Sequence, residues 1–235
     1  MAKKTTSQQL PLFLPIEAAS ARDDLVVGPS NHAAVEFLDA WPQWSTSFVV
    51  LAGPVGAGKS HLAQVWASRA SATFLKPPLG NAEFDLREAG NFVVEDIAQG
   101  AFDEQWLFHL FNLVRSNGGS LLLTSRRWPG EWGIALPDLQ SRMKTAHLIE
   151  LAEPDDALLS GVLFKLLSDR QMTVDHAVID YCTKRMERSL AFARRLVDTL
   201  DHMSLSQKRP VTVPLAAEAL EMIELVGNSG VDDTV

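Results

Sequence analysis

An octapeptide with the sequence GPVGAGKS, residues 53–60, permits only a few folds. It matches the pattern G-x-x-x-x-G-K-[ST] and lies between a predicted strand and a predicted helix, the context in which this pattern binds phosphate. The glycines let backbone amides surround phosphate oxygens. Lys59 is expected to reach the β and γ phosphates, and Ser60 to offer an oxygen to Mg²⁺. An ordinary glycine-rich turn would leave Lys59 and Ser60 unexplained.

The rest of the chain predicts a parallel sheet followed by a helical domain. Short runs that are apolar on both faces alternate with helical patterns, which is typical of a parallel sheet covered by helices. After Pro154 only helical spacing is found. The predicted strands are 47–53, 72–76, 91–96, 120–125 and 146–151, and the predicted helices are 59–70, 102–117, 137–143, 155–170, 175–187, 188–205 and 214–225.

Four segments follow from these patterns: a flexible arm (1–24), an α/β nucleotide-binding domain (25–153), a helical domain (154–226) and a disordered tail (227–235). No apolar run reaches the roughly 18 residues that a membrane span needs. A single cysteine, Cys182, excludes an internal disulfide and fits the reducing cytoplasm. We therefore expect a cytoplasmic protein without a membrane segment.

Charge argues against direct binding to DNA. The formal net charge is −8 and the pI is about 5.2, whereas nucleic-acid binders need clustered Lys and Arg. DNA is then reached indirectly, through a partner. The tryptophans are expected to pack helices or line an interface rather than stack on bases; they are Trp41, Trp44, Trp66, Trp106, Trp128 and Trp132.

Polar residues follow two of the predicted strands. Glu95 and Asp96 come directly after one apolar run, where either carboxylate could hold Mg²⁺ beside a phosphate loop. Thr124 and Ser125 end another run. Their hydroxyls could orient a water near the γ phosphate or cap the next turn, and the sequence leaves both interpretations open.

Together these segments resemble the DnaA family of AAA+ proteins and its shorter, Hda-like regulatory relatives. LVVGPSN (25–31) resembles the segment that holds adenine, and GPVGAGKS and VVEDI resemble the Walker A and B elements. The resemblance implies an AAA+ core with a small all-α lid, binding ADP or ATP with Mg²⁺. It places the metal at Ser60, Glu95 and Asp96, with Asp96 also catalytic. The implied nucleotide contacts are Val27, Gly53, Pro54, Val55, Gly56, Ala57, Gly58, Lys59, Ser60, His61 and Arg188.

Two arginines acquire roles through this resemblance. LPDLQSRM (136–143) resembles the family's arginine-finger segment, with Arg142 at the finger position. A guanidinium inserted into a neighbour's site can stabilise a phosphoryl group in transfer. MERSLAFARRL (186–196) resembles the second-sensor helix, with Arg188 at the sensing position. Taken alone, either arginine would be interpreted as a solvated or ion-paired side chain.

The start of the chain carries an apolar peptide, QLPLF (9–13). It resembles the peptide by which proteins dock on the bacterial sliding clamp, the β subunit of DNA polymerase III. The clamp-binding residues would be Gln9, Leu10, Leu12 and Phe13. The alternative is an arm that folds back onto the protein's own core. DnaA initiators continue into a helix-turn-helix domain, whereas this chain ends at Val235, so direct origin binding is not expected.

Two departures from the family pattern favour a regulator over an enzyme. Glu95 replaces an Asp, and Arg126 stands where DnaA-type proteins carry an acidic first sensor. Both changes predict weak intrinsic ATP hydrolysis. The resemblance then implies a negative regulator of replication initiation that stimulates hydrolysis by DnaA through Arg142, with a homodimer allowed. Alternatives are an autonomous ATPase of helicase-loader type, a small-molecule P-loop kinase and a clamp-binding adaptor without nucleotide dependence.

Overall fold

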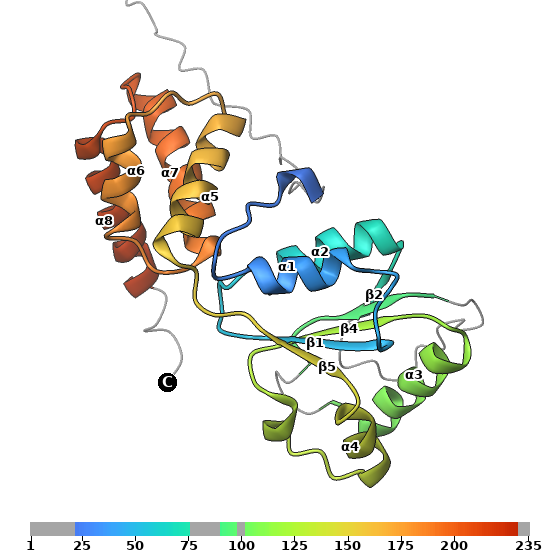
Figure 1. Ribbon diagram of the computed structural model, residues 1–235. Coiled ribbons are helices and arrows are strands. Elements are labelled where there is room, and N and C mark those ends of the chain that lie inside the picture. Colours follow the sequence, from blue (N-terminus) through green and yellow to red (C-terminus); the bar gives the residue numbers. More distant parts are fainter. Residues whose placement is uncertain (1–21, 76–89, 98–101, 230–235) are drawn as a thin grey trace, which may run out of the picture.

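The computed structural model describes residues 22–75, 90–97 and 102–229 (Figure 1). Its sheet has five strands, all parallel, in the order β2-β3-β4-β1-β5, which confirms the predicted parallel sheet. The connection after β1 leads toward one edge of the sheet and the connection after β4 leads toward the other. The strands are β1 (Phe48–Ala52), β2 (Thr73–Leu75), β3 (Phe92–Val94), β4 (Leu121–Ser125) and β5 (His147–Glu150).

Helices cover both faces of the sheet because alternate strand residues point to opposite sides. In β1, Val49 and Leu51 pack toward α1 (His32–Asp39) and α2 (Lys59–Ala70). Phe48 and Val50 pack toward α3 (Glu104–Ser116) and α4 (Pro137–Met143) on the other face. Two short 3-10 helices, η1 (Arg22–Asp24) and η2 (Pro129–Glu131), complete the described part of this domain.

The helices after Pro154 form a second core of their own, set apart from the sheet in Figure 1. Leu196, Val197 and Leu215 lie at its centre, fully buried, and Cys182 is buried there too. Burial raises the pKa of the Cys182 thiol to about 11, which keeps it protonated at neutral pH. The helices are α5 (Asp156–Asp169), α6 (His176–Thr183), α7 (Leu190–Gln207) and α8 (Val213–Ser229), so α8 extends three residues past the expected boundary at 226.

No helix among the described residues is long and apolar enough to cross a membrane.

Several contacts join the helical domain, called the lid below, to the sheet domain, and two of them involve the segment 25–31 and the phosphate loop. Asp155 caps α5 by accepting from Leu158 N at 2.8 Å, and its second oxygen accepts from Ser30 N at 2.8 Å. At the second contact, Leu190 N donates to Gly56 O at 2.9 Å, where α7 begins. A Cβ on Gly56 would lie 2.2 Å from Ser189 Oγ, so the lid rests directly on the backbone of residue 56.

We expect Asp155→Ala to lower the free energy of unfolding by about 1–2 kcal/mol, because a helix cap and an interdomain hydrogen bond are lost together. Urea unfolding measures this difference, with the exposed Glu153→Ala as the matched control. Equal stability of the two variants would contradict a structural role for Asp155.

The contribution of Asp155 to the free energy of unfolding should depend on pH. Burial acts to raise the pKa of Asp155, but hydrogen bonds from Leu158, Ser30 and Ala157 outweigh it and the pKa lies below its ordinary value. A lowered carboxyl pKa gives stability that is present above the unfolded-state pKa of about 3.9. This stability is lost as the pH falls through the folded-state value, so the two variants should converge at acidic pH.

Gly56→Ala should destabilise the protein by about 2 kcal/mol or more, because an added Cβ meets Ser189 and residue 56 has a φ of 80°. Gly118→Ala controls for the backbone alone: its φ is 70° with nothing within 4 Å of the added Cβ, and about 1 kcal/mol is expected. Gly130→Ala has open space without a left-handed backbone and should be neutral. Thermal unfolding of the three variants measures the order of their stabilities. Equal losses of stability in Gly56→Ala and Gly118→Ala would refute the close contact between Gly56 and Ser189.

Candidate nucleotide site

The loop 53–60 leaves the carboxyl end of β1 and opens α2, as the sequence predicts. Gly53 N donates to Ser125 O at 3.2 Å, which fixes the start of the loop to the end of β4. Gly58 adopts a φ of 98° before the first turn of α2. The backbone amides of Val55, Gly56 and Gly58 donate no hydrogen bond to any acceptor among the described residues. A strand end, a glycine turn and unpaired amides at a helix start are what a phosphate group requires.

Lys59 is buried at the base of this loop, with 6% of its surface exposed. Its Nζ donates to Gly53 O at 2.8 Å and to Pro54 O at 2.7 Å. Burial lowers the pKa of Lys59, the Asp96 carboxylate raises it, and Arg126 lowers it further. The ammonium group is therefore held inside the loop, where a phosphate could replace the two carbonyl oxygens as its partner.

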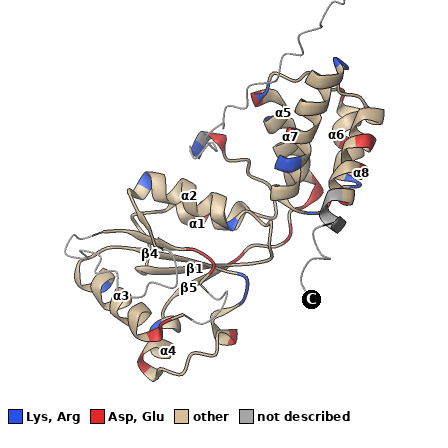
Figure 2. Ribbon diagram, turned by 180° about the vertical axis from the view of Figure 1, so that it is seen from behind, with Lys and Arg blue, Asp and Glu red and all other residues tan. Residues whose placement is uncertain are grey.

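Glu95 and Asp96 follow β3 and lie beside the end of β4. Asp96 N donates to Thr124 Oγ1 at 2.9 Å, and the Asp96 backbone has a φ of 48°. Asp96 Oδ2 lies 3.7 Å from Arg126 Nη2. Figure 2 shows acidic and basic ribbon segments next to each other at this end of the sheet. The acid that would serve a metal thus faces a cation of the same chain.

The residues around the loop fit Mg²⁺ only in part. Glu95 Oε1 is buried without a hydrogen-bond partner among the described residues, so it could accept a cation. Ser60 is exposed at the start of α2 and could supply a second oxygen. Asp96, however, already faces Arg126. The loop fits a phosphate better than its surroundings fit a metal ion.

The two hydroxyls at the end of β4 make different contacts. Ser125 Oγ accepts from Arg127 N at 3.1 Å and so caps the following turn. Thr124 Oγ1 accepts from Asp96 N at 2.9 Å and so connects the ends of β4 and β3. Both side chains are buried, with at most 1% exposed.

The lid places Arg188 near the site but gives it another partner. Its guanidinium donates to Asp156 Oδ1 at 2.6 Å and to Pro154 O at 3.1 Å. Half of the side chain is exposed, so solvent weakens this ion pair. Arg188 can therefore exchange Asp156 for another anion at modest cost.

The remaining predicted contacts lie in the loop itself, at the start of α2, or in the segment beside α5. Val27 is 41% exposed and precedes Gly28, whose backbone touches Leu158 of α5. His61 is half-buried in the first turn of α2; burial lowers its pKa, and Arg194 and Lys165 of the lid lower it further. Pro54 and Val55 are exposed at the tip of the loop, whereas Ala57 is buried beneath it.

Arg142 is the one predicted site residue, among those the structure describes, that lies far from this cluster. It occupies the last turn of α4, just before β5 begins, and its Nη2 lies 3.4 Å from Asn112 Oδ1. Because β5 runs parallel to β1, the start of β5 lies at the amino-terminal end of the strands and the end of β1 lies at their carboxyl end. Gln9, Leu10, Leu12 and Phe13 fall outside the described residues.

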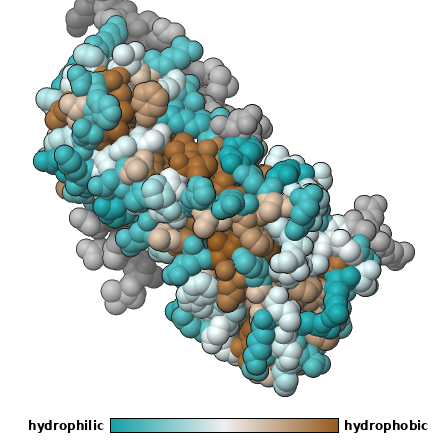
Figure 3. All heavy atoms as spheres, in the orientation of Figure 1, coloured by the Kyte–Doolittle hydropathy of each residue, from teal (hydrophilic) through white to brown (hydrophobic). Residues whose placement is uncertain are grey.

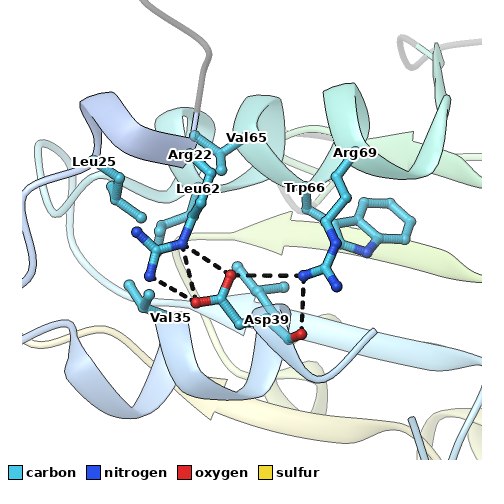
Figure 4. Close-up of a pocket in the computed structure, with 9 residues that line it drawn as sticks. Arg22, Leu25, Val35, Asp39, Leu62, Val65, Trp66 and Arg69 are labelled. Carbon is cyan, nitrogen blue, oxygen red and sulfur yellow. Dashed lines mark hydrogen bonds and ion pairs between the residues drawn. The ribbon is translucent and has the colours of Figure 1, made fainter. Parts of the chain in front are cut away.

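Two hollows lie elsewhere in the molecule, away from the phosphate loop. The first, about 20 Å³, lies between α1 and α2 and is large enough only for a water molecule (Figure 4). Arg22 and Arg69 both bind Asp39 beside it, and the hydrogen bond from Arg22 is the main reason that the pKa of Asp39 lies below its ordinary value. This cluster attaches the first described residues to α1.

The second hollow is an open groove between α1 and β5, where the rings of Phe37 and His147 stack 4.0 Å apart. Figure 3 shows apolar atoms gathered over this part of the molecule. Neither hollow is lined by residues of the phosphate loop. Trp41 and Trp44, which follow α1, each pack on Trp66 of α2, as expected for tryptophans that pack helices.

Sequence reasoning missed two residues that the structure brings into this region. Asp155 joins the lid to the segment 25–31, and Asp156 binds Arg188. The Asp pair after Pro154 signals a helix start in the sequence, but nothing in the pattern indicates which distant groups the two carboxylates bind.

The family model described as "Hda, lid domain" matches residues 162–220. Domain III of the replication initiation protein DnaA from Thermotoga maritima is similar in structure, with a TM-score of 0.73 and 19% identity over 88% of this chain and 98% of that chain. AMPPCP-bound DnaA from Aquifex aeolicus gives a TM-score of 0.67 and 18% identity, over 88% and 69% of the two chains. The RuvB Holliday junction branch migration motor of Thermotoga maritima gives 0.64 and 18%, over 82% and 68%.

The parallel sheet order, the phosphate loop and the separate helical core agree with these likenesses. Residues 162–220 therefore match an Hda-type lid domain, and the described part of the chain has the AAA+ fold of these structures.

Proposed function

We propose that this chain is a cytoplasmic negative regulator of replication initiation that stimulates ATP hydrolysis by DnaA. The Hda-type lid and the DnaA-like fold support a DnaA-related replication regulator. In the proposed mechanism the chain binds an adenine nucleotide, docks on the DNA-loaded sliding clamp and presents Arg142 to the nucleotide site of DnaA.

The position of Arg142 carries this proposal. The five residues of β1 separate the amino-terminal and carboxyl ends of the strands by about 17 Å, at roughly 3.3 Å per residue. Arg142 lies at the edge where β5 begins, while the phosphate loop follows the end of β1. An arginine side chain cannot cover that distance, so Arg142 is unsuited to its own nucleotide. A guanidinium in the last turn of a surface helix can instead enter a neighbouring molecule's site.

Adenine nucleotide binding is supported by the unpaired amides of the loop 53–60 and by Lys59. The related DnaA from Aquifex aeolicus was solved with AMPPCP. ADP and ATP both remain candidates as the bound form, with Val27 at the adenine and Arg188 directed to the phosphates once it leaves Asp156. Ser60 and Glu95 would hold Mg²⁺ if it accompanies the nucleotide. Its chemistry there would be to neutralise phosphate charge.

The clamp would be reached through Gln9, Leu10, Leu12 and Phe13. Leu12 and Phe13 would bury apolar surface in a groove on the clamp, while Pro11 lowers the cost of ordering the peptide. DNA would then be contacted only through the clamp, in agreement with the net charge of −8.

Arg142→Ala should reduce the stimulation of DnaA ATP hydrolysis by a factor of about 10³ or more, since arginine fingers contribute on that scale. The measurement is hydrolysis of radiolabelled ATP bound to DnaA, with the clamp loaded on DNA. Lys144→Ala is the matched control, because Lys144 is an exposed cation two residues away. Full stimulation by a folded, clamp-bound Arg142→Ala protein would refute the proposed finger.

The double change Leu12→Ala/Phe13→Ala should abolish stimulation on clamp-loaded DNA by removing the apolar anchor. Nucleotide binding by the isolated protein, followed by fluorescence, should stay unchanged because these residues precede the folded domains. A loss of nucleotide binding would indicate instead an arm folded onto the protein's own core.

The same assays separate the alternatives. An autonomous ATPase of helicase-loader type would hydrolyse ATP without DnaA and would lose that activity in Lys59→Ala. A clamp-binding adaptor without nucleotide dependence would keep full stimulation in Lys59→Ala. The regulator proposed here should show little turnover alone and should lose stimulation when Lys59 is changed.

A further inference from the structure

We propose that Arg126 supplies the positive charge that Mg²⁺ provides in an ordinary phosphate-loop site, so that this chain binds a nucleoside diphosphate or triphosphate without a metal ion. The inference rests on the nucleotide binding proposed above and assigns a further residue to that site. Arg126 faces Asp96 in the structure and would turn to phosphate oxygens when a nucleotide binds.

The fold brings Arg126 and Asp96 together through neighbouring strands. Asp96 follows β3, Arg126 follows β4, and the two strands pair in parallel with Val94 opposite Leu123. Ile97 N donates to Thr124 O at 3.0 Å, and Asp96 N donates to Thr124 Oγ1. These bonds hold the Asp96 backbone beside the end of β4, and its carboxylate lies 3.7 Å from the Arg126 guanidinium.

The pair also belongs to the phosphate loop. Asp96 and Arg126 are the two charged groups that act on the pKa of the buried Lys59 ammonium, in opposite directions. About half of the Arg126 side chain is exposed, which leaves room for it to turn toward a ligand in the loop. A guanidinium binds phosphate oxygens through two parallel hydrogen bonds, so such a turn would gain charge-assisted contacts.

Charge balance favours the same role. Lys59 and Arg126 offset Glu95 and Asp96, so this cluster is neutral before a nucleotide binds. With an acidic residue at position 126 the cluster would carry two negative charges and would repel phosphates until a divalent cation neutralised it. Exchanging an acid for an arginine changes the charge by two units, the same amount that one Mg²⁺ brings.

The site also offers few suitable ligands for a magnesium ion. Mg²⁺ needs near-octahedral oxygen ligands, and the carboxylates that hold it must be available. The Arg126 guanidinium lies 3.7 Å from the Asp96 carboxylate, so a cation bound at Asp96 would stand beside a fixed positive charge. Glu95 and Ser60 alone would bind the ion weakly.

The test is calorimetric titration of the full chain with ADP and with ATP, in EDTA and in Mg²⁺. We expect the dissociation constant of the unaltered protein to change less than about threefold between the two conditions. Arg126→Asp should bind at least about tenfold more weakly in EDTA and should recover when Mg²⁺ is added. Arg127→Asp makes the same charge change at the neighbouring exposed residue and should behave like the parent. Circular dichroism and thermal unfolding check that each variant folds.

Each outcome decides a different point. If the unaltered protein binds nucleotide at least about tenfold more tightly with Mg²⁺ than in EDTA, the inference is wrong while the proposed nucleotide binding stands. If it binds neither nucleotide under either condition, both are wrong. Equal losses for Arg126→Asp and Arg127→Asp would also overturn the inference, because the effect would then be general charge repulsion. The comparison with the unaltered protein decides the matter even if Arg126→Asp fails to fold.

Discussion

The parallel pairing of β1 with β4 and β5 determines where the candidate functional residues of the sheet domain lie. Because the strands run in one direction, the residues that follow β1, β3 and β4 meet at one edge of the sheet. That edge receives Lys59, Asp96 and Arg126. The opposite edge receives Arg142, which precedes β5. The candidate nucleotide site and the proposed finger residue thus lie at opposite ends of the same strands because of one register.

Most of the sheet and the lid could be predicted because their signals are local. The buried strands β1 and β4 are continuous apolar runs, and α2 and α4 begin and end at the predicted residues. Helix α1 is not among the predicted helices. It has only eight residues, its cap Asn31 makes no side-chain bond to the helix, and the preceding segment carries only the adenine resemblance. Asn31 instead binds Gly28 N and Val26 O and so shapes that segment.

The candidate site shows why residue types are easier to predict than partners. GPVGAGKS predicts the phosphate loop after β1, and VVED predicts two acidic residues at the end of β3. Nothing in those motifs indicates that Lys59 binds Gly53 O and Pro54 O, or that Arg188 binds Asp156. Such pairs join residues from separate elements, so their choice depends on the packed fold. The departure at Arg126 is visible in the sequence, but its pairing with Asp96 is not.

The cations of the candidate site make contacts within the chain that a phosphate could replace. Lys59 is held by loop carbonyls, Arg188 by Asp156, and Arg126 faces Asp96. Arg126 and Arg188 are about half exposed, so solvent screens both ion pairs and little free energy opposes their exchange for phosphate. Leu190 N also donates to Gly56 O, so the lid contacts the loop directly. A nucleotide would then change the partners of these cations and leave this interface in place. That agrees with the proposed regulator, in which the bound nucleotide would fix the shape of the chain while DnaA hydrolyses ATP.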